Sequence, residues 1–174
     1  MELTTDQKGA IAELAIAKAA IELGIDVYRP VAEGGRYDLI FELGKRLVRV
    51  QCKWASRYGD VLVVRCYSAR RTRDGLVRRP YEPGEVDAFA AYCPDLDRCY
   101  FLPYDAFPRR NQIQLRVAST RNNQRLRINW AENFEFSATL ARVPGAIAQL
   151  GERLDGIQKV AGSSPAGSTS EAAD

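Results

Sequence analysis

The stretch YDLIFELGKRLVRVQCKWAS, from Tyr37 to Ser56, holds two extended apolar runs around a short turn at 43–46. Two such runs, rich in Val, Leu, Ile and Phe and close in sequence, predict a pair of antiparallel strands. The second run carries Gln51 and Lys53 at positions where a buried strand should hold apolar residues. The two polar residues mark either the solvated face of an edge strand or a site where chemistry takes place.

A helix is predicted ahead of this hairpin. The segment TTDQKGAIAELAIAKAAIELG (4–24) offers Thr5 or Asp6 as N-cap and Gly24 as terminator. Its apolar residues recur at helical spacing, and they include Ile11, Leu14, Ala15 and Ile21.

Further strands are predicted on both sides of the hairpin and in the second half of the chain. The candidates are DVYRP (26–30), DVLVVRCYS (60–68), RCYFLPY (98–104), NQIQLRVAS (111–119) and QRLRINW (124–130). The segment EPGEVDAFAAYC (82–93) predicts a short helix. This order predicts an α/β fold with a mixed central β-sheet flanked by helices, and its antiparallel start argues against a doubly wound nucleotide-binding fold.

Composition limits the chemistry that the chain can perform. The 174 residues suit one domain with a core of its own, and the net charge is only +3. The chain contains no histidine, which removes the usual general base and the commonest zinc ligand. Catalysis must therefore use carboxylates, lysine and a hard metal ion.

The four cysteines, Cys52, Cys66, Cys93 and Cys99, lack C-x-x-C spacing. Neither a disulfide framework nor a zinc knot is expected from this pattern, and we expect reduced, mostly buried thiols. No apolar run approaches the ~18 residues that a membrane span needs. These observations predict a soluble cytoplasmic protein without a membrane partner.

Four residues form a candidate catalytic group. If the two strands pair around 43–46, Asp38 lies opposite Gln51 and Lys53, which share one strand face while Cys52 points to the other. Glu13, in the middle of the predicted helix, could complete the group. A glutamate on an Ala-rich helix is usually solvated, and an aspartate can begin a strand through turn chemistry. Gln51 and Lys53 are harder to explain in this way because both interrupt an apolar run.

Such a group suits hydrolysis of a phosphodiester. Carboxylate and amide oxygens are hard ligands for Mg²⁺, which polarises the phosphate and lowers the pKa of a bound water. A lysine beside the metal activates that water or neutralises the developing charge. We therefore expect Mg²⁺ as cofactor, with Glu13, Asp38 and Gln51 as its ligands and Lys53 as the fourth catalytic residue.

The order of these motifs resembles the PD-(D/E)xK nuclease superfamily, and within it the branch of group I intron homing endonucleases. The resemblance spans 3–136 and rests on the segments QKGAIAELAIAKAAIELG, YDLIFE, VQCKWA and VDAFAAYCPDLDRCYFLP. It implies a restriction-endonuclease-like core and a Mg²⁺-dependent, site-specific endonuclease that cleaves double-stranded DNA.

Two residues depart from the superfamily pattern. Tyr37 replaces the usual proline, which carries no chemistry, and Gln51 replaces the middle carboxylate. The intron-endonuclease branch is similar in using glutamine there. Two alternatives stay open: a Holliday-junction resolvase or repair nuclease on the same core, and a catalytically inactive DNA-binding protein.

Two arginine-rich segments predict contacts with DNA. The segments 65–79 and 109–127 each hold six arginines, and the second also carries several Asn and Gln residues. Arginine forks suit phosphate and guanine, and side-chain amides suit adenine. The expected DNA-binding residues are Arg70, Arg71, Arg73, Arg109, Arg110, Arg116, Arg121, Asn123, Arg125 and Arg127.

Cleavage of both DNA strands requires two active sites, so we expect a homodimer or homotetramer. We predict a nuclease domain over 1–140 and a C-terminal extension over 141–174, whose Gly, Ser and Ala content indicates poor order. Its segments IAQLGER and GSSP can be encoded by triplets that resemble the D and T arms of a tRNA gene. An amphipathic helix over 147–154 followed by a tail is the other interpretation.

Overall fold

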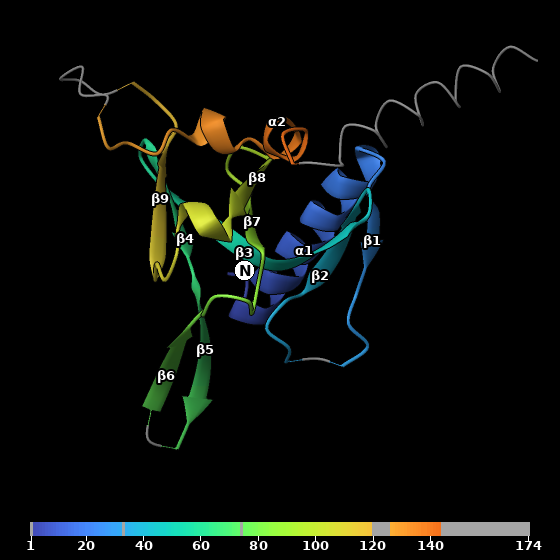
Figure 1. Cartoon of the computed structure of the whole chain (residues 1–174). Coiled ribbons are helices and arrows are strands. Elements are labelled where there is room, and N and C mark those ends of the chain that lie inside the picture. The colour runs from blue at the N-terminus through green and yellow to red at the C-terminus, as the bar shows by residue number, and fades with distance from the viewer. Residues whose placement is uncertain (1, 33, 74, 120–125, 144–174) are drawn as a thin grey trace, which may run out of the picture.

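The fold is built on a mixed β-sheet, and one long helix lies across one of its faces (Figure 1). The computed structural model describes residues 2–32, 34–73, 75–119 and 126–143. In these ranges seven strands form the main sheet and two more form a separate two-stranded ribbon. The predicted α/β class with a mixed central sheet is confirmed. The predicted extension lies outside the described residues from 144 onward.

Strand β3 (Arg46–Tyr58) is the centre of the main sheet. It pairs antiparallel with β2 and β4 and parallel with β7. Strand β1 adds to β2, β9 adds to β4, and β8 adds to β7, all antiparallel. The bounds of these strands are β1 (Asp26–Tyr28), β2 (Leu39–Leu43), β4 (Val61–Arg65), β7 (Ala88–Cys93), β8 (Arg98–Pro103) and β9 (Gln112–Arg116).

The β2–β3 hairpin forms as its sequence predicts. Leu43 pairs with Arg46, and Gly44 between them has a φ of 63°, a value that glycine adopts without a steric cost. Every second residue of β2, from Leu39 to Leu43, is fully buried. This two-residue period fixes the register, because a shift by one residue would turn the buried side chains to the opposite face.

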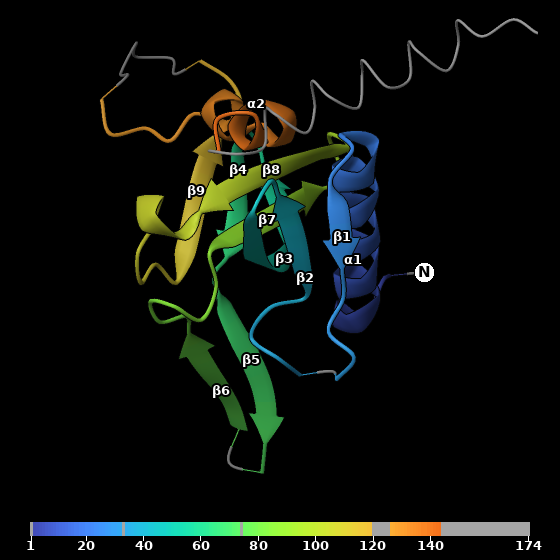
Figure 2. The same ribbon diagram turned by 45° about the vertical axis from the view of Figure 1, so that its right-hand side comes forward.

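Helix α1 (Thr5–Glu22) packs on β3 and β7. It lies on one side of the main sheet (Figure 2). Its N-cap is Thr4, which exchanges capping-box hydrogen bonds with Gln7, and not Thr5 or Asp6 as predicted. Its buried residues are Ala12, Ile16 and Ala20, while Ile11, Leu14 and Ile21 are exposed. Three of the larger apolar residues therefore lie on the outer side of the helix, while Ile16 is in the core.

The segment 82–93 differs from its prediction, since its second half is strand β7 and not a helix. All but one of the residues of β7 are buried, and the strand lies parallel to β3 and antiparallel to β8. A central strand buried on both faces shows no alternation, and its alanines favour a helix when read alone. The predicted strand 60–68 is interrupted at Cys66, and 126–130 contains only a bridge at Trp130.

The opposite face of the sheet has its own core. Phe89, Tyr81 and Tyr104 pack together there, next to the 3-10 helix η1 (Tyr104–Ala106). Beyond β9 the chain forms the 3-10 helix η2 (Ala131–Phe134) and the short helix α2 (Phe136–Leu140), whose Phe136 packs against Phe41 and Phe101 on the α1 side.

All four cysteines are free thiols, three of them buried and Cys99 partly so. No helix in the described ranges is long and apolar enough to cross a membrane.

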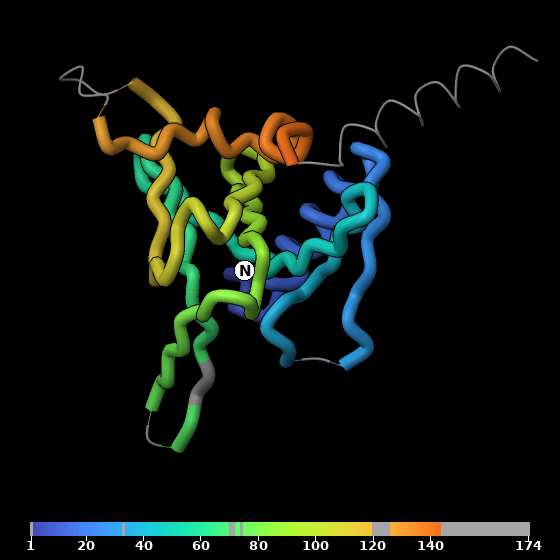
Figure 3. Tube along the Cα trace, in the orientation of Figure 1, coloured from blue at the N-terminus to red at the C-terminus, as the bar shows by residue number. Residues whose placement is uncertain are grey.

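Strands β5 (Tyr67–Thr72) and β6 (Gly75–Pro80) form an antiparallel ribbon that projects away from the sheet (Figures 1 and 2). Every described residue of β6 is exposed. The tube in Figure 3 follows the chain out along β5 and back along β6 before it re-enters the body ahead of β7. We call β5 and β6 the ribbon; its base is the Tyr67–Pro80 pair and its tip is the turn at 72–75.

The parallel pairing of β3 with β7 begins at an ion pair. The carboxylate of Asp87 accepts hydrogen bonds from the Arg49 side chain at 3.0 and 2.9 Å and from the Arg49 backbone N–H at 2.8 Å. Partial burial alone would raise the pKa of Asp87, but these bonds outweigh it and hold the pKa below its ordinary value. The ionised Asp87 therefore fixes β7 beside β3 at the start of their ladder.

Replacing Asp87 with Asn should destabilise the fold by about 1 kcal/mol at pH 7, since the pair is partly exposed. The lowered pKa means that this contribution is present above the unfolded pKa of ~3.9 and is lost as pH falls through the folded value. Urea unfolding at pH 7 and at pH 3 measures both effects, with Glu82→Gln, at an exposed carboxylate, as control. An equal loss at both pH values would contradict this account.

Candidate active site

Asp38 lies at the point where β2 stops pairing with β3. Its backbone N–H donates to the Val50 carbonyl at 2.9 Å, which continues the β2–β3 ladder by one bond. Its carboxylate then accepts the backbone N–H of Cys52 at 2.8 Å through Oδ2. The carboxylate therefore takes the place of a strand partner and is fixed against the edge of β3.

Gln51 contacts Asp38 directly. Its amide Nε2 donates to Asp38 Oδ2 and lies 3.5 Å from the Cys52 carbonyl. Gln51 is only 8% exposed, so this bond satisfies a polar group that burial would otherwise leave costly. With Nε2 engaged in this way, the carbonyl oxygen Oε1 is the atom of Gln51 that is able to contact a cation.

Glu13 reaches the same group from α1. Its side chain is 27% exposed and forms an ion pair with Arg29. Burial raises the pKa of Asp38, and the negative charge of Glu13 raises it further, while the Cys52 N–H and the charge of Lys53 act in the opposite direction. Two carboxylates held close together in this manner favour a cation between them. Sequence reasoning missed Arg29, which lies in an irregular segment without a motif.

Lys53 lies on the face of β3 away from α1. Cys52 belongs to the core under α1, and strand alternation turns Gln51 and Lys53 to the other side. The Lys53 Nζ donates to the Tyr67 carbonyl at 3.2 Å and to the Tyr81 hydroxyl at 3.4 Å. Burial lowers the pKa of Lys53, and the charge of Asp38 opposes that shift. The lysine is therefore held at the site but is easier to deprotonate than a surface lysine.

The donor set of this group fits a hard cation, although not through carboxylates alone. Nowhere in the described ranges do three His, Cys, Asp or Glu side chains gather as a metal-binding group. Glu13, Asp38 and Gln51 offer two carboxylates and one amide, and all three are oxygen donors of the kind that Mg²⁺ prefers. The hydrogen bonds to Asp38 both end on Oδ2, so Oδ1 is the carboxylate oxygen directed to other partners.

The predicted DNA-binding residues fall into separate places. Arg70 and Arg71 belong to β5, and exposed Arg73 lies at the tip of the ribbon. Arg109 and Arg110 are exposed in the loop after η1, and Arg127 is exposed at a φ of 59°. Arg121, Asn123 and Arg125 lie outside the described residues.

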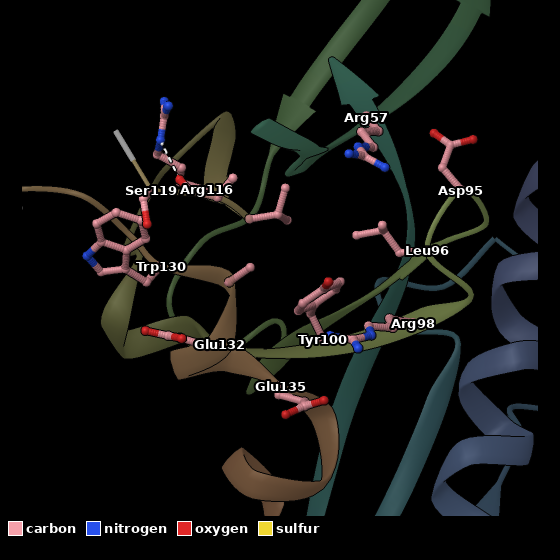
Figure 4. A pocket seen from close by; sticks show the side chains of 13 residues that line it. Arg57, Asp95, Leu96, Arg98, Tyr100, Arg116, Ser119, Trp130, Glu132 and Glu135 are labelled. Atoms are coloured by element: carbon pink, nitrogen blue, oxygen red, sulfur yellow. Dashed lines mark hydrogen bonds between the residues drawn. The ribbon is translucent and has the colours of Figure 1, made fainter. Parts of the chain in front are cut away.

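Arg116 does not reach outward as expected of a phosphate ligand. Its Nε donates to the Ala118 carbonyl at 2.9 Å, and its side chain lines a cleft of about 790 Å³. Figure 4 shows Arg57, Arg98 and Arg116 around this cleft, together with Glu132 and Glu135. None of Glu13, Asp38, Gln51 and Lys53 lines it. The candidate active site is therefore separate from this cleft.

Comparisons with known proteins identify the family of the chain. Residues 3–137 match the family described as PD-(D/E)XK endonuclease. A solved structure, that of the bacterial homing endonuclease I-Ssp6803I, is 27% identical and superposes with a TM-score of 0.64. The match covers 88% of this chain and 99% of that one. A search of curated proteins found no match. The chain therefore belongs to the PD-(D/E)XK endonuclease family.

Proposed function

We propose that this nuclease is a Mg²⁺-dependent, site-specific endonuclease for double-stranded DNA, of the intron-homing type. The observation that carries the proposal is the direct contact between Asp38 and Gln51, with Glu13 and Lys53 on either side. The likeness to a bacterial homing endonuclease supports the homing role.

Glu13, Asp38 and Gln51 would hold the metal ion. When bound, Mg²⁺ would supply a Lewis acid for the phosphate and a water of lowered pKa. Asp38 is anchored to β3 by the Cys52 N–H, so its carboxylate keeps its position whether or not a cation is present. Gln51 adds an oxygen without adding charge, which leaves the net charge of the ligand set at −2.

Lys53 would act on the substrate side of this group. Its ammonium is held by two oxygen acceptors at the ribbon base and is close enough to Asp38 for the two charges to interact. A cation at this place stabilises the negative charge that develops on the phosphate. Its lowered pKa also allows it to take a proton from the attacking water.

The ribbon and the loop after η1 would bind the DNA. A two-stranded ribbon fits the major groove of B-DNA, and the exposed side chains of Arg73 and Arg78 suit phosphates or guanine edges. Arg109 and Arg110 extend the basic surface from the neighbouring loop.

Cutting both strands would require a second copy of this site, so we propose a homodimer or homotetramer. The outer side of α1 offers a surface for such contacts. Leu14 and Ile21 are 64% and 61% exposed there; Ile11 lies on the same helix, and exposed Leu3 lies just ahead of its N-cap.

Selection from a plasmid library of random inserts, incubated with protein and Mg²⁺, tests the proposal. Linearised plasmids sharing one sequence would support site-specific cleavage of both strands. Faster cleavage of a synthetic four-way junction than of the selected duplex would favour a resolvase instead. DNA binding without cleavage in Mg²⁺ would overturn the assignment of activity.

Lys53→Met should reduce cleavage of the selected duplex by at least 10³-fold while its affinity for that duplex changes less than threefold. The reason is that Lys53 acts on the reacting phosphate, whereas the ribbon and loops bind the DNA. Single-turnover cleavage and gel-shift titration measure the two quantities. Lys45→Met, at an exposed turn lysine, is the matched control. Cleavage by Lys53→Met at the wild-type rate would remove Lys53 from the site.

Gln51→Glu should make the fold more dependent on Mg²⁺. The change replaces the amide that donates to Asp38 with a carboxylate. When no cation is present, this new carboxylate repels the carboxylate of Asp38. The melting temperature should fall by several degrees in EDTA, and Mg²⁺ should raise it more than in the wild type. Gln114→Glu, at an exposed position of β9, controls for added charge. An unchanged response to Mg²⁺ would exclude Gln51 as a ligand.

Arg73→Ala should weaken binding to any duplex and lower the slope of log K against log salt by about 0.9, as expected for one lost phosphate contact. Fluorescence anisotropy across a salt series measures this slope. Arg142→Ala, at an exposed arginine beyond α2, is the control because that position lies at the end of the molecule away from the ribbon. Equal slopes in the two variants would leave the ribbon tip without a role in phosphate binding.

A further inference from the structure

The base of the ribbon supplies two oxygen atoms that accept hydrogen bonds from the Lys53 ammonium. We call these two acceptors the seat of Lys53. Tyr67 is the first residue of β5, Tyr81 directly follows β6, and the Tyr67–Pro80 pair closes the ribbon. The Lys53 Nζ donates to the Tyr67 carbonyl at 3.2 Å and to the Tyr81 hydroxyl at 3.4 Å. One acceptor therefore comes from each strand's end, and the lysine bridges the two.

Arg36 closes this seat from the loop ahead of Asp38. Its guanidinium lies 3.9 Å from the centre of the Tyr81 ring. It donates to the Ser68 hydroxyl of β5 at 2.9 Å, to the Pro80 carbonyl of β6 at 2.6 Å and to Glu85 at 2.7 Å. Arg36 thus ties both strands of the ribbon to the segment that carries Asp38.

Packing alone does not account for this arrangement. Tyr81 is buried against Phe89, and a phenylalanine at position 81 would fill the same space. What the hydroxyl adds is its contact with Lys53. The Nε of Arg36 is also buried without a hydrogen-bond partner among the described residues.

We propose that Tyr81 and Arg36 are positioning residues for Lys53, and that the ribbon base sets where the lysine ammonium stands. The part of Lys53 in cleavage rests on the proposed function. The geometry of the seat does not, since it depends only on the contacts of Lys53 with Tyr67 and Tyr81.

Tyr81→Phe tests the proposal. The substitution should lower the single-turnover cleavage rate at saturating DNA about tenfold, the range for one lost hydrogen bond to a charged group, with little change in DNA affinity. Tyr92→Phe, on β7, is the matched control. It also removes a tyrosine hydroxyl that makes one hydrogen bond, which it donates to Asp97 at 2.9 Å. Equal rates in both variants and the wild type would overturn the proposal while leaving the endonuclease assignment intact.

A second measurement is independent of cleavage. The chain has five lysines, so the side-chain NMR signals of a lysine-labelled sample are few, and Lys53→Met identifies that of Lys53. Tyr81→Phe should shift this signal and leave those of Lys18 and Lys45 in place, and Arg36→Met should shift it too. An unmoved signal in both variants would overturn the seat even if no DNA substrate is found. A shifted signal without any cleavage would count against the proposed function alone.

Discussion

The hydrogen bond from the Cys52 N–H to the Asp38 carboxylate is the contact on which the site depends. It forms because the paired residues of β2 begin at Leu39, so Asp38 lies just outside the strand and an N–H of β3 is left without a strand partner. A side chain then satisfies a backbone donor. The same contact places the Asp38 carboxylate where Gln51 donates a hydrogen bond to it. At this position the charges of Glu13 and Lys53 both act on Asp38. A break in sheet pairing is therefore what brings the proposed catalytic residues together.

The unfavourable interaction within this group is the repulsion between the carboxylates of Asp38 and Glu13. Asp38 is partly buried beside a second carboxylate, and Glu13 already takes Arg29 as counter-ion. Neutral Gln51 limits the repulsion and supplies a donor that a glutamate would lack. The departure from the superfamily pattern thus has a local physical reason: the amide stabilises Asp38 in the absence of a cation.

The sequence predicted the parts of the fold whose period reflects one buried face. The β2–β3 hairpin and the pairing of Asp38 with Gln51 follow from alternation and turn chemistry, both of which are local. Strand β7 could not be predicted in this way, because burial on both faces removes the alternation and its alanines are good helix formers. Helix α1 was predicted correctly, but its periodicity did not identify the buried side, where Ala12 and Ala20 lie while Leu14 and Ile21 are exposed. Arg29, Arg36 and Tyr81 come from irregular segments or strand ends, and only the tertiary fold brings them to the site.

The ribbon divides into two regions under different constraints. Arg36 and Lys53 donate hydrogen bonds to its base, and Glu85 accepts one from Arg36. A substitution at the base would therefore disturb the candidate active site. Its outer part is solvent-exposed, and Leu76 and Val77 are 56% and 54% exposed. Substitutions in this outer part leave the contacts of the base intact. With the ribbon as the proposed DNA contact, such a division would let a lineage acquire new DNA targets by mutation at one end of a hairpin while the proposed hydrolytic residues at the other end stay the same.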